Sequence, residues 1–529
     1  MHTSDVNFLH ITCALSCLIV KVLEESDKPI LLRCFDNHVF SCESYSHELG
    51  NLTEFNNPDG WEFQQELQES YGQVVKVHGL FGRRELFVFD PAALHSILVQ
   101  DQDIYEPPET LLCLNGLLLG KGIFSTANDD HRRYRKIMTP AFSTANLRGM
   151  IPLFYEVAER ARDGLIAPTV IDAPQTIDMN SILCRTSLEF IGCAGIDYSF
   201  DPMLPGKEQT DRYSQALKAM LPTAYKMQPA FPLLPFVAKV FFLSFLRRII
   251  NFIPLPALHE LRDIVDFTYA IPAELVQNRK AAIEKGGPAT DNDHKSIMSL
   301  MMKSNASAES AMHMTDKELV AATSMIILAA TDTTSSAMNR MLHILAMYPD
   351  VQEKLRSEIL AAPEHLDHDT LTVLPYLDGI VHEILRLAMA DTVLPLSKPI
   401  TGLDGAHMRS IKITKGTSIH VAIAAGEDAL EFKPERWTND KADSVTTKIS
   451  GVYGNILTFI GGGRSCIGFQ FAQLEMKVVA CVLLRSFKFS APDPRIQWRK
   501  TGLTTSPYID NQSALPILVE RLKTRLAHV

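Results

Sequence analysis

The stretch TFIGGGRSCIGFQFAQLEMK, from Thr458 to Lys477, carries the most information about the fold. It places glycines, an arginine and a lone cysteine, Cys466, directly before a helical pattern. Glycine lets a backbone approach a flat, bulky group closely. A thiol at a helix N-terminus is expected to have a lowered pKa, because backbone N–H groups and the helix dipole favour its anion. A cysteine nucleophile needs a histidine base, and the loop contains none, so the pattern favours a thiolate that binds a group.

Composition excludes several classes of protein. The chain has 529 residues, is 46% hydrophobic and carries a net charge of −10 without a long basic run, which argues against nucleic-acid binding. Its nine cysteines are an odd, scattered set without Cys-x-x-Cys, so neither a disulfide framework nor a zinc ribbon is indicated. A reducing, cytosol-facing compartment fits this cysteine usage best.

Two apolar stretches allow more than one interpretation. Residues 1–35 form a hydrophobic N-terminal segment whose apolar run, Phe8–Val20, is 13 residues long. A spanning helix needs about 20 apolar residues, and the start of the chain lacks the Lys or Arg of a signal peptide. A weak membrane anchor, a buried helix and a damaged leader remain open. The stretch Leu233–Leu258 is either a core helix pair or a surface that dips into a membrane.

The remaining pattern predicts a mainly α protein with a minor β portion. Residues 73–90 indicate two strands around a Gly79–Gly82 turn, and residues 91–285 are mostly helical in pattern. A further helical block extends to Ala361, followed by short strands, the cysteine loop and another helix. Neither a Rossmann glycine fingerprint nor a P-loop occurs, so no nicotinamide, flavin or nucleotide site is predicted within the chain.

One long helix is predicted to begin at a capping box formed by Thr315 and Glu318 and to run to Tyr348. Its middle is apolar on all sides, which indicates burial. The sequence TDTTSS, residues 331–336, then places an acid and five hydroxyls in that helix. Such residues compete for backbone hydrogen bonds. A functional role is favoured over an acid that merely faces solvent.

Two further clusters of charge are weaker signals on their own. Glu383 lies on the apolar face of a helix with Arg386 three residues later, and Arg436 is a second candidate partner. The alternative is an ordinary surface pair. His131 and Arg135 are four residues apart and share a helical face, which either binds anionic groups or is a solvated basic surface.

Taken together, these segments resemble the cytochrome P450 family, the haem-thiolate monooxygenases. The spacing Phe459-x-x-Gly462-x-Arg464-x-Cys466-x-Gly468 is similar to the family's haem-binding loop. The segments HRRYR, AATDTT, Glu383-x-x-Arg386 and PERW follow in family positions, with His131 in an aromatic slot and Ala330 where glycine is usual. The resemblance extends from about Asn57 to the C-terminus and is greatest to fungal microsomal members.

The resemblance implies a P450-like fold over residues 36–529 as one domain, with haem between the long central helix and the cysteine loop. Cys466 would be the axial thiolate of haem b. Asp332 and Thr333 would be the catalytic pair that relays protons. Arg464, His131 and Arg135 would pair with the propionates. The cofactor-binding residues implied are Phe459, Gly462, Arg464, Gly468, His131, Arg135 and Ala329, and the structural core is Glu383, Arg386 and Arg436.

The implied reaction inserts one oxygen atom from O₂ into a lipophilic small molecule, in secondary metabolism. Electrons would come from NADPH-cytochrome P450 reductase, approached through Arg132, Arg133 and Lys136. The resemblance places the chain on the endoplasmic-reticulum membrane, facing the cytosol, with no nucleic-acid partner.

Three junctions are short compared with the family. The proline-rich hinge after the anchor is replaced by residues 33–51, a Pro-Pro segment is missing after Arg386, and Ala425 runs directly into the PERW region. Because the ligand loop is intact, haem binding is expected to be more secure than turnover. The alternatives are a truncated or mis-spliced member without turnover and a haem-thiolate isomerase, dehydratase or peroxygenase.

Overall fold

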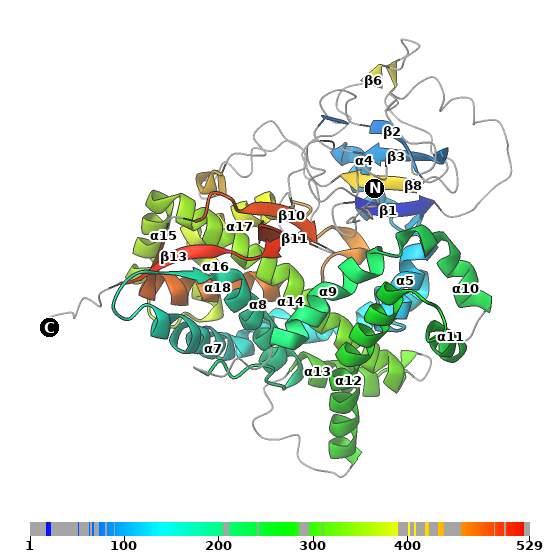
Figure 1. Cartoon of the computed structure of the whole chain (residues 1–529), viewed down its shortest axis with the longest axis horizontal. Coiled ribbons are helices and arrows are strands. Elements are labelled where there is room, and N and C mark those ends of the chain that lie inside the picture. Colours follow the sequence, from blue (N-terminus) through cyan, green and yellow to red (C-terminus); the bar gives the residue numbers. More distant parts are fainter. Residues whose placement is uncertain are drawn as a thin grey trace, which may run out of the picture.

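A long central helix organises the fold (Figure 1). In this computed structural model, α14 spans Asp316–Met347, and Thr315 and Glu318 make both hydrogen bonds of the predicted capping box. Pro349, which opens the next helix, follows at once. Residues 319–328 are buried all along the helix, because most are apolar and the Thr323 and Ser324 hydroxyls donate to carbonyls four residues earlier.

The structure describes residues 17–22, 51, 63, 66–67, 74–79, 82–88, 90–204, 211–240, 243–284, 296–309, 312–389, 400–401, 407–408, 418–422, 432–437, 456–490, 492–501 and 504–522. The short junctions after Arg386 and Ala425, most of the segment 33–51, and most of the helix expected near residues 60–69 lie outside these ranges.

Helices make up most of this part of the chain, as predicted. The first ones are α4 (Pro91–His95), α5 (Glu109–Leu119), α6 (Asn128–Met138), α7 (Thr144–Ala161), α8 (Met179–Phe190) and α9 (Asp211–Tyr225). They are followed by α10 (Leu234–Val240), α11 (Leu243–Ile250), α12 (Pro256–Glu284) and α13 (Ile297–Ala306). After α14 come α15 (Pro349–Ala361), α16 (His368–Val373), α17 (Pro375–Met389) and α18 (Phe469–Ser486).

The strands form small sheets at the edge of the helical body (Figure 1). The largest has the order β2-β3-β8-β1-β4, with strands β1 (Cys17–Val22), β2 (Val74–His78), β3 (Arg84–Val88), β4 (Tyr105–Glu106) and β8 (Ser418–Ala422). The predicted hairpin is present: β2 and β3 are antiparallel, and Gly82 adopts a φ of 70° in the turn. β3 pairs in parallel with β8, which comes from more than 300 residues later in the chain.

Smaller sheets were not predicted in detail. One joins β10 (Gln497–Thr501), β11 (Thr504–Ile509) and β12 (Gln512–Ser513). Another joins β5 (Gln175–Asp178), β13 (Pro516–Arg521) and β9 (Phe487–Ser490), and the short β6 (Ile400–Thr401) pairs with β7 (His407–Met408).

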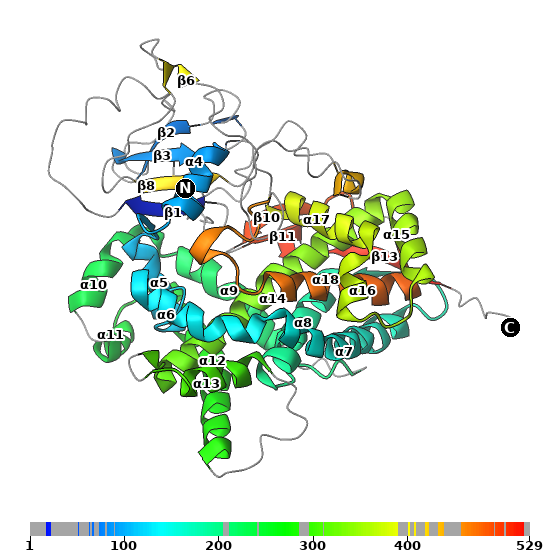
Figure 2. The ribbon, with the colours of Figure 1, turned by 180° about the vertical axis from the view of Figure 1, so that it is seen from behind.

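Two hydrophobic cores meet at the segment before the cysteine. Ile456 and Phe459 belong to the large helical core, whereas Leu457 belongs to the smaller core under the β2-β3-β8 sheet and Ile460 packs against it. Seen from behind, the orange segment that leads into α18 lies between the sheet and the helices (Figure 2). The cysteine loop is therefore held by both parts of the fold.

The two ambiguous apolar stretches can now be placed in part. Cys17–Val22 forms strand β1 against β8, and the other residues of the N-terminal segment lie outside the described ranges. Across Leu233–Leu258, the core interpretation is wrong for several large apolar side chains: Leu233, Phe236, Val240, Phe252 and Leu255 are all exposed. Among the described residues, no helix is both long enough and apolar enough to cross a membrane.

Candidate active site

The backbone of the cysteine loop is tightly constrained. The Cys466 N–H donates to the Phe459 carbonyl at 2.8 Å, and the Ser465 N–H donates to the Gly462 carbonyl at 3.1 Å. Gly462 adopts a φ of 67°, and a Cβ there would lie 2.1 Å from the Leu98 carbonyl oxygen. Only glycine satisfies both conditions. The loop therefore fixes where the Cys466 side chain emerges.

The Cys466 thiol is enclosed by the fold yet keeps accessible surface, because it lines an internal cavity. Burial raises its pKa above the usual value, and the Gly468 N–H and the Arg135 charge offset only part of this. The expectation of a lowered pKa is therefore wrong for the free thiol, since desolvation outweighs the helix terminus. A bound cation is what would hold this sulfur as a thiolate.

The cavity has a volume of about 320 Å³ and lies between the cysteine loop, α5 and α14. Its walls are mainly apolar. The side chains that set this character include Leu111, Leu114, Leu118, Ile123, Met325 and Ile326. Ala329 and Ala330 also line it, so the part of α14 that faces the loop presents small side chains. The cavity suits a flat group on the thiol and a lipophilic molecule beyond it.

Three basic side chains gather at one side of this cavity: His131 and Arg135 from α6, and Arg464 from the loop. Burial, followed by the charges of Arg464 and Arg135, lowers the pKa of His131 to about 3. Arg135 donates to Ser465, and Arg464 forms an ion pair with Glu106. The positive charge concentrated here fits an anionic group at the cavity wall.

The hydroxyls of α14 face different neighbours. The Thr333 hydroxyl lines the cavity and donates to the Ala329 carbonyl at 2.7 Å. Asp332 is buried, accepts a hydrogen bond from Thr504 at 3.2 Å, and has a raised pKa because of burial. Thr504 itself lines the cavity. Asp332 therefore reaches the cavity through a hydroxyl, and the alternative that it merely faces solvent is excluded by its burial.

Glu383 is the centre of a buried polar cluster behind the loop. Its side chain is 0% exposed and accepts from the Lys433 N–H at 2.8 Å and from the Trp437 indole at 2.6 Å. Arg436 completes the cluster with its Nε 3.2 Å from the Glu383 carboxylate. The ordinary surface pair is thereby excluded. Arg386 lies in α17, but its side chain is outside the part of the chain that the structure describes.

Comparison with known proteins agrees with this geometry. The family model described as "Cytochrome P450" matches residues 46–508. The chain belongs to the cytochrome P450 family. Cytochrome P450 monooxygenases 91 and 81 of Postia placenta are 40% and 39% identical to it, over 90% of this chain and 92% and 91% of theirs. The ganoderic acid synthetase of Ganoderma lucidum is 35% identical over 90% of this chain and 92% of its own.

Members of the family use haem with a cysteine thiolate ligand, together with O₂, a redox partner and a lipophilic substrate. This P450 is accordingly a haem-dependent monooxygenase, as the sequence predicted. The mainly helical fold is the one expected for the family.

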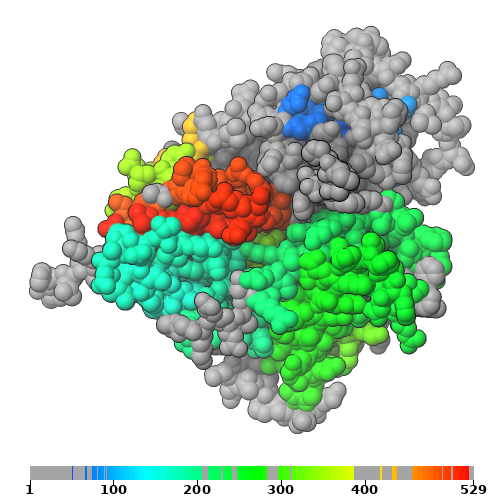
Figure 3. Space-filling view, viewed as in Figure 1, coloured from blue at the N-terminus to red at the C-terminus, as the bar shows by residue number. Residues whose placement is uncertain are grey.

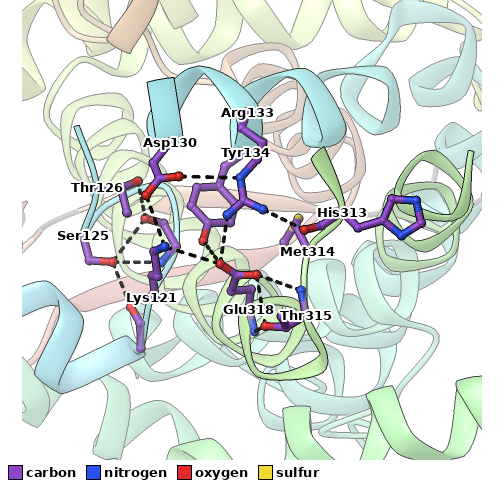
Figure 4. Close-up of polar contacts among 12 residues, drawn as sticks. Lys121, Ser125, Thr126, Asp130, Arg133, Tyr134, His313, Met314, Thr315 and Glu318 are labelled. Carbon is purple, nitrogen blue, oxygen red and sulfur yellow. Dashed lines mark hydrogen bonds and ion pairs between the residues drawn. The ribbon is translucent and has the colours of Figure 1, made fainter. Parts of the chain in front are cut away.

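Figure 4 shows how this P450 holds α6 against the start of α14. Glu318 accepts hydrogen bonds from the Tyr134 hydroxyl and from Arg133, the latter at 2.9 Å, and it also caps its own helix through Thr315. The Arg133 side chain is only 13% exposed and pairs with Glu318, so it presents little of its charge at the surface. Arg132 and Lys136, in contrast, are exposed.

Sequence reasoning missed several residues that shape the site. Glu106 pairs with Arg464, Gln102 accepts from the Gly463 N–H, and Trp437 donates to Glu383. Gln102 and Glu106 lie in a stretch without periodicity, far from the loop in sequence, so no local pattern indicated them. Trp437 could have been found, since it directly follows Arg436.

Proposed function

We propose that the Cys466 thiolate would hold the iron of haem b in this cavity, and that the chain inserts one atom of O₂ into a lipophilic molecule bound beyond it. The observation that carries the proposal is the thiol itself. It opens onto a mainly apolar cavity whose opposite wall, on α14, carries the Thr333 hydroxyl. When bound, haem supplies the iron that binds and activates O₂.

The residues present fit haem. Arg135 and Arg464 are cations at the cavity wall, and neutral His131 can donate an N–H, so all three suit the two propionates. Arg464 would share its guanidinium between Glu106 and a propionate, because guanidinium has five donors. The short side chains of Ala329 and Ala330 would leave room for the group between α14 and the cysteine loop.

We assign proton delivery to Asp332 and Thr333. Burial raises the pKa of Asp332, which favours its protonated form, and Thr504 links its carboxyl group to the cavity. Thr333 holds its hydroxyl at the wall through the Ala329 carbonyl and can accept or pass on a proton there. An intact relay favours oxygen activation over isomerase or dehydratase chemistry, which needs less proton delivery.

The relative named ganoderic acid synthetase supports a role in secondary metabolism for this chain as well. The mainly apolar walls support a substrate recognised by burial rather than by charge. Fatty acids, terpenoids, polyketides and aromatic compounds all have that chemistry.

We further propose NADPH-cytochrome P450 reductase as the electron donor, docking at the exposed Arg132 and Lys136. These residues line a hollow of about 690 Å³ beside the cysteine loop, the side from which electrons have the shortest path to the thiolate. Lys136→Glu is expected to lower reductase-supported turnover several-fold, and more so at low salt. Turnover unchanged by Lys136→Glu, with the same Cys466-dependent spectrum, would contradict this docking site.

We also propose attachment to the endoplasmic-reticulum membrane, with the catalytic part facing the cytosol. Leu233, Phe236, Val240, Phe252 and Leu255 are exposed within one stretch of the chain, and we call this set the apolar patch. Its segment, α10 to α12, is green on the face drawn in Figure 3. α10 packs on α5, which lines the cavity, and Lys239 pairs with Glu109 at 2.7 Å. A patch of this kind suits a lipid surface and places it beside the cavity.

The test is incorporation of isotopically heavy oxygen gas. The holoprotein, reductase and NADPH are incubated with a fatty acid, a terpenoid, a polyketide and an aromatic hydrocarbon, and products are read by mass spectrometry. A single heavy atom in one product, lost in Thr333→Ala, supports the proposal. A product that carries no heavy atom would point to isomerase or dehydratase chemistry, and no product with intact haem would point to a chain without turnover.

A further inference from the structure

A second buried acid lies beside the cavity, on the side of α18. Glu475 is 0% exposed, and neither of its carboxylate oxygens makes a hydrogen bond of ordinary geometry with a described residue. Burial raises its pKa well above the usual value, which favours the neutral form. Unpartnered acids are rarely retained in a core, because each costs free energy that an apolar side chain would not.

The group that faces Glu475 is the hydroxyl of Thr334, which partly offsets the effect of burial. Thr334 is buried and lines the cavity. Its neighbours on α14 use their hydroxyls locally, since Thr331 and Thr333 donate to carbonyls four residues earlier and Ser335 donates to Asp332. No such bond from Thr334 to a carbonyl occurs within the described ranges. Its hydroxyl is therefore free to interact with both Glu475 and the cavity.

The two acids approach the cavity from different sides of α14. Residues two positions apart in an α-helix are rotated by about 200° about the helix axis, so Asp332 and Thr334 point in nearly opposite directions. Asp332 faces Thr504 of β11, whereas Thr334 faces α18, which packs on α14. Glu475 is consequently independent of the Asp332–Thr333 pair.

We propose that Glu475 is a positioning residue whose neutral carboxyl O–H donates to the Thr334 oxygen and thereby turns the Thr334 proton into the cavity. A hydroxyl fixed as a donor there holds a water molecule or a polar substrate atom in one orientation. No proton leaves Glu475 in this arrangement, so the acid needs no path to solvent. The inference rests on the monooxygenase activity of the family and adds a donor opposite Asp332.

The experiment uses the full-length holoprotein and three variants. Glu475→Met removes the acid at similar volume, Glu475→Gln keeps a donor, and Thr334→Val removes the hydroxyl. Gln473→Met is the matched control. Gln473 is buried on the same helix and also has a side-chain nitrogen without a hydrogen-bond partner among the described residues. It differs from Glu475 in that the Thr334 hydroxyl faces Glu475.

Infrared spectroscopy gives the first result without any turnover. The parent minus Glu475→Gln difference should contain the carbonyl stretch of a protonated carboxylic acid at neutral pH, and Thr334→Val should shift that band. A missing band, or a band that Thr334→Val leaves in place, would overturn the proposal even if the chain proved inactive. A missing haem spectrum would instead count against the function proposed above.

The second result comes from thermal stability and from how tightly NADPH consumption is coupled to product formation. The coupling is measured with the substrate that the heavy-oxygen assay identifies. Glu475→Met should raise Tm by ~1–3 °C, because it removes a buried carboxyl group whose other oxygen has no hydrogen-bond partner among the described residues. It should also raise the hydrogen peroxide released per NADPH several-fold. Glu475→Gln should release about as much hydrogen peroxide per NADPH as the parent. Thr334→Val should release as much as Glu475→Met, and the variant with both substitutions should release no more than either one alone. If Glu475→Met and Gln473→Met released the same amount of hydrogen peroxide per NADPH, Glu475 would be a packing residue and the proposal would be wrong.

Discussion

Glycine at position 462 shows how one residue sets the site. A φ of 67° is costly for any other residue, and the space that a Cβ needs is taken by the Leu98 carbonyl. The loop passes between two cores at this point, so neither side can move away freely. The same constraint directs the Cys466 thiol into the cavity.

Gly462→Ala should therefore destabilise the holoprotein by about 2–4 kcal/mol, from left-handed strain plus displacement of the Leu98 backbone. Urea unfolding and haem retention measure this. Gly149→Ala is the control, since a Cβ at that helical position meets nothing within 4 Å and should stabilise by about 0.5–1 kcal/mol. Equal stability of the two variants would contradict the strain argument.

Glu383 is a second residue whose surroundings determine how much its substitution changes the free energy of unfolding. Glu383→Ala would remove the buried carboxylate that accepts from the Trp437 indole and pairs with Arg436, at a cost of about 3–5 kcal/mol. Lys354→Ala removes half of an exposed pair with Glu435 and should change the free energy of unfolding by less than about 1 kcal/mol. Denaturant titration of both variants tests the contrast, and a loss under 1 kcal/mol for Glu383→Ala would refute it.

At the scale of elements, the contact between α6 and α14 positions two of the basic side chains at the cavity. Tyr134 and Arg133 of α6 both bond Glu318 in the first turn of α14 (Figure 4). Burial alone would raise the pKa of Glu318, but hydrogen bonds from Tyr134, the Thr315 N–H and Arg133 lower it to about 2. The carboxylate is thus a fixed link between the helices that carry His131 and Asp332.

This link predicts a pH dependence. The folded pKa of Glu318, about 2, lies below its ordinary value of 4.5, so its contribution is complete above pH 4.5 and is lost as pH falls toward 2. Full loss corresponds to roughly 3 kcal/mol. Glu318→Gln should therefore unfold more easily at pH 7 and lose less stability on acidification. Glu109→Gln removes one charge of an exposed ion pair, so its free energy of unfolding should vary with pH as that of the parent does. If Glu318→Gln and the parent lost the same free energy of unfolding on acidification, the link would be contradicted.

The helices that carry the site could be predicted because their signals are local. The capping box of α14 and the apolar face of α18 are contained within one helix each. The strands after α18 were missed, because β9 and β13 pair with each other and β13 also pairs with β5, over 300 residues earlier. The Cys466 pKa was mispredicted for a related reason, since burial depends on the whole fold and outweighs the helix terminus.

At the scale of the whole molecule, the apolar patch and the cavity involve helices that pack against each other. α10 bears part of the apolar patch and packs on α5, which lines the cavity. A substrate that partitions into lipid would then reach the cavity without crossing a long aqueous path. The resemblance to the family implied a haem site between the long helix and the cysteine loop, whereas exposure of the patch depends on how α10 to α12 pack and was left open by the sequence.

The patch makes a prediction about membrane binding. Phe236→Asp with Phe252→Asp should reduce flotation of the full chain with phospholipid vesicles several-fold, because two large exposed side chains become charged. Val373→Asp is the control, as Val373 is 71% exposed on α16, outside the patch. Flotation that the double variant leaves unchanged would show that the patch is not the site of attachment.

The spectrum of the reduced, carbon monoxide-bound protein tests the central claim most directly. The account predicts the red-shifted Soret band of thiolate-ligated haem for the parent chain. Cys466→Ser should lose it, whereas Cys481→Ser should keep it, since Cys481 is buried in α18. A parent band typical of histidine or neutral thiol ligation, or the same band in Cys466→Ser, would contradict the assignment of Cys466 as the haem ligand.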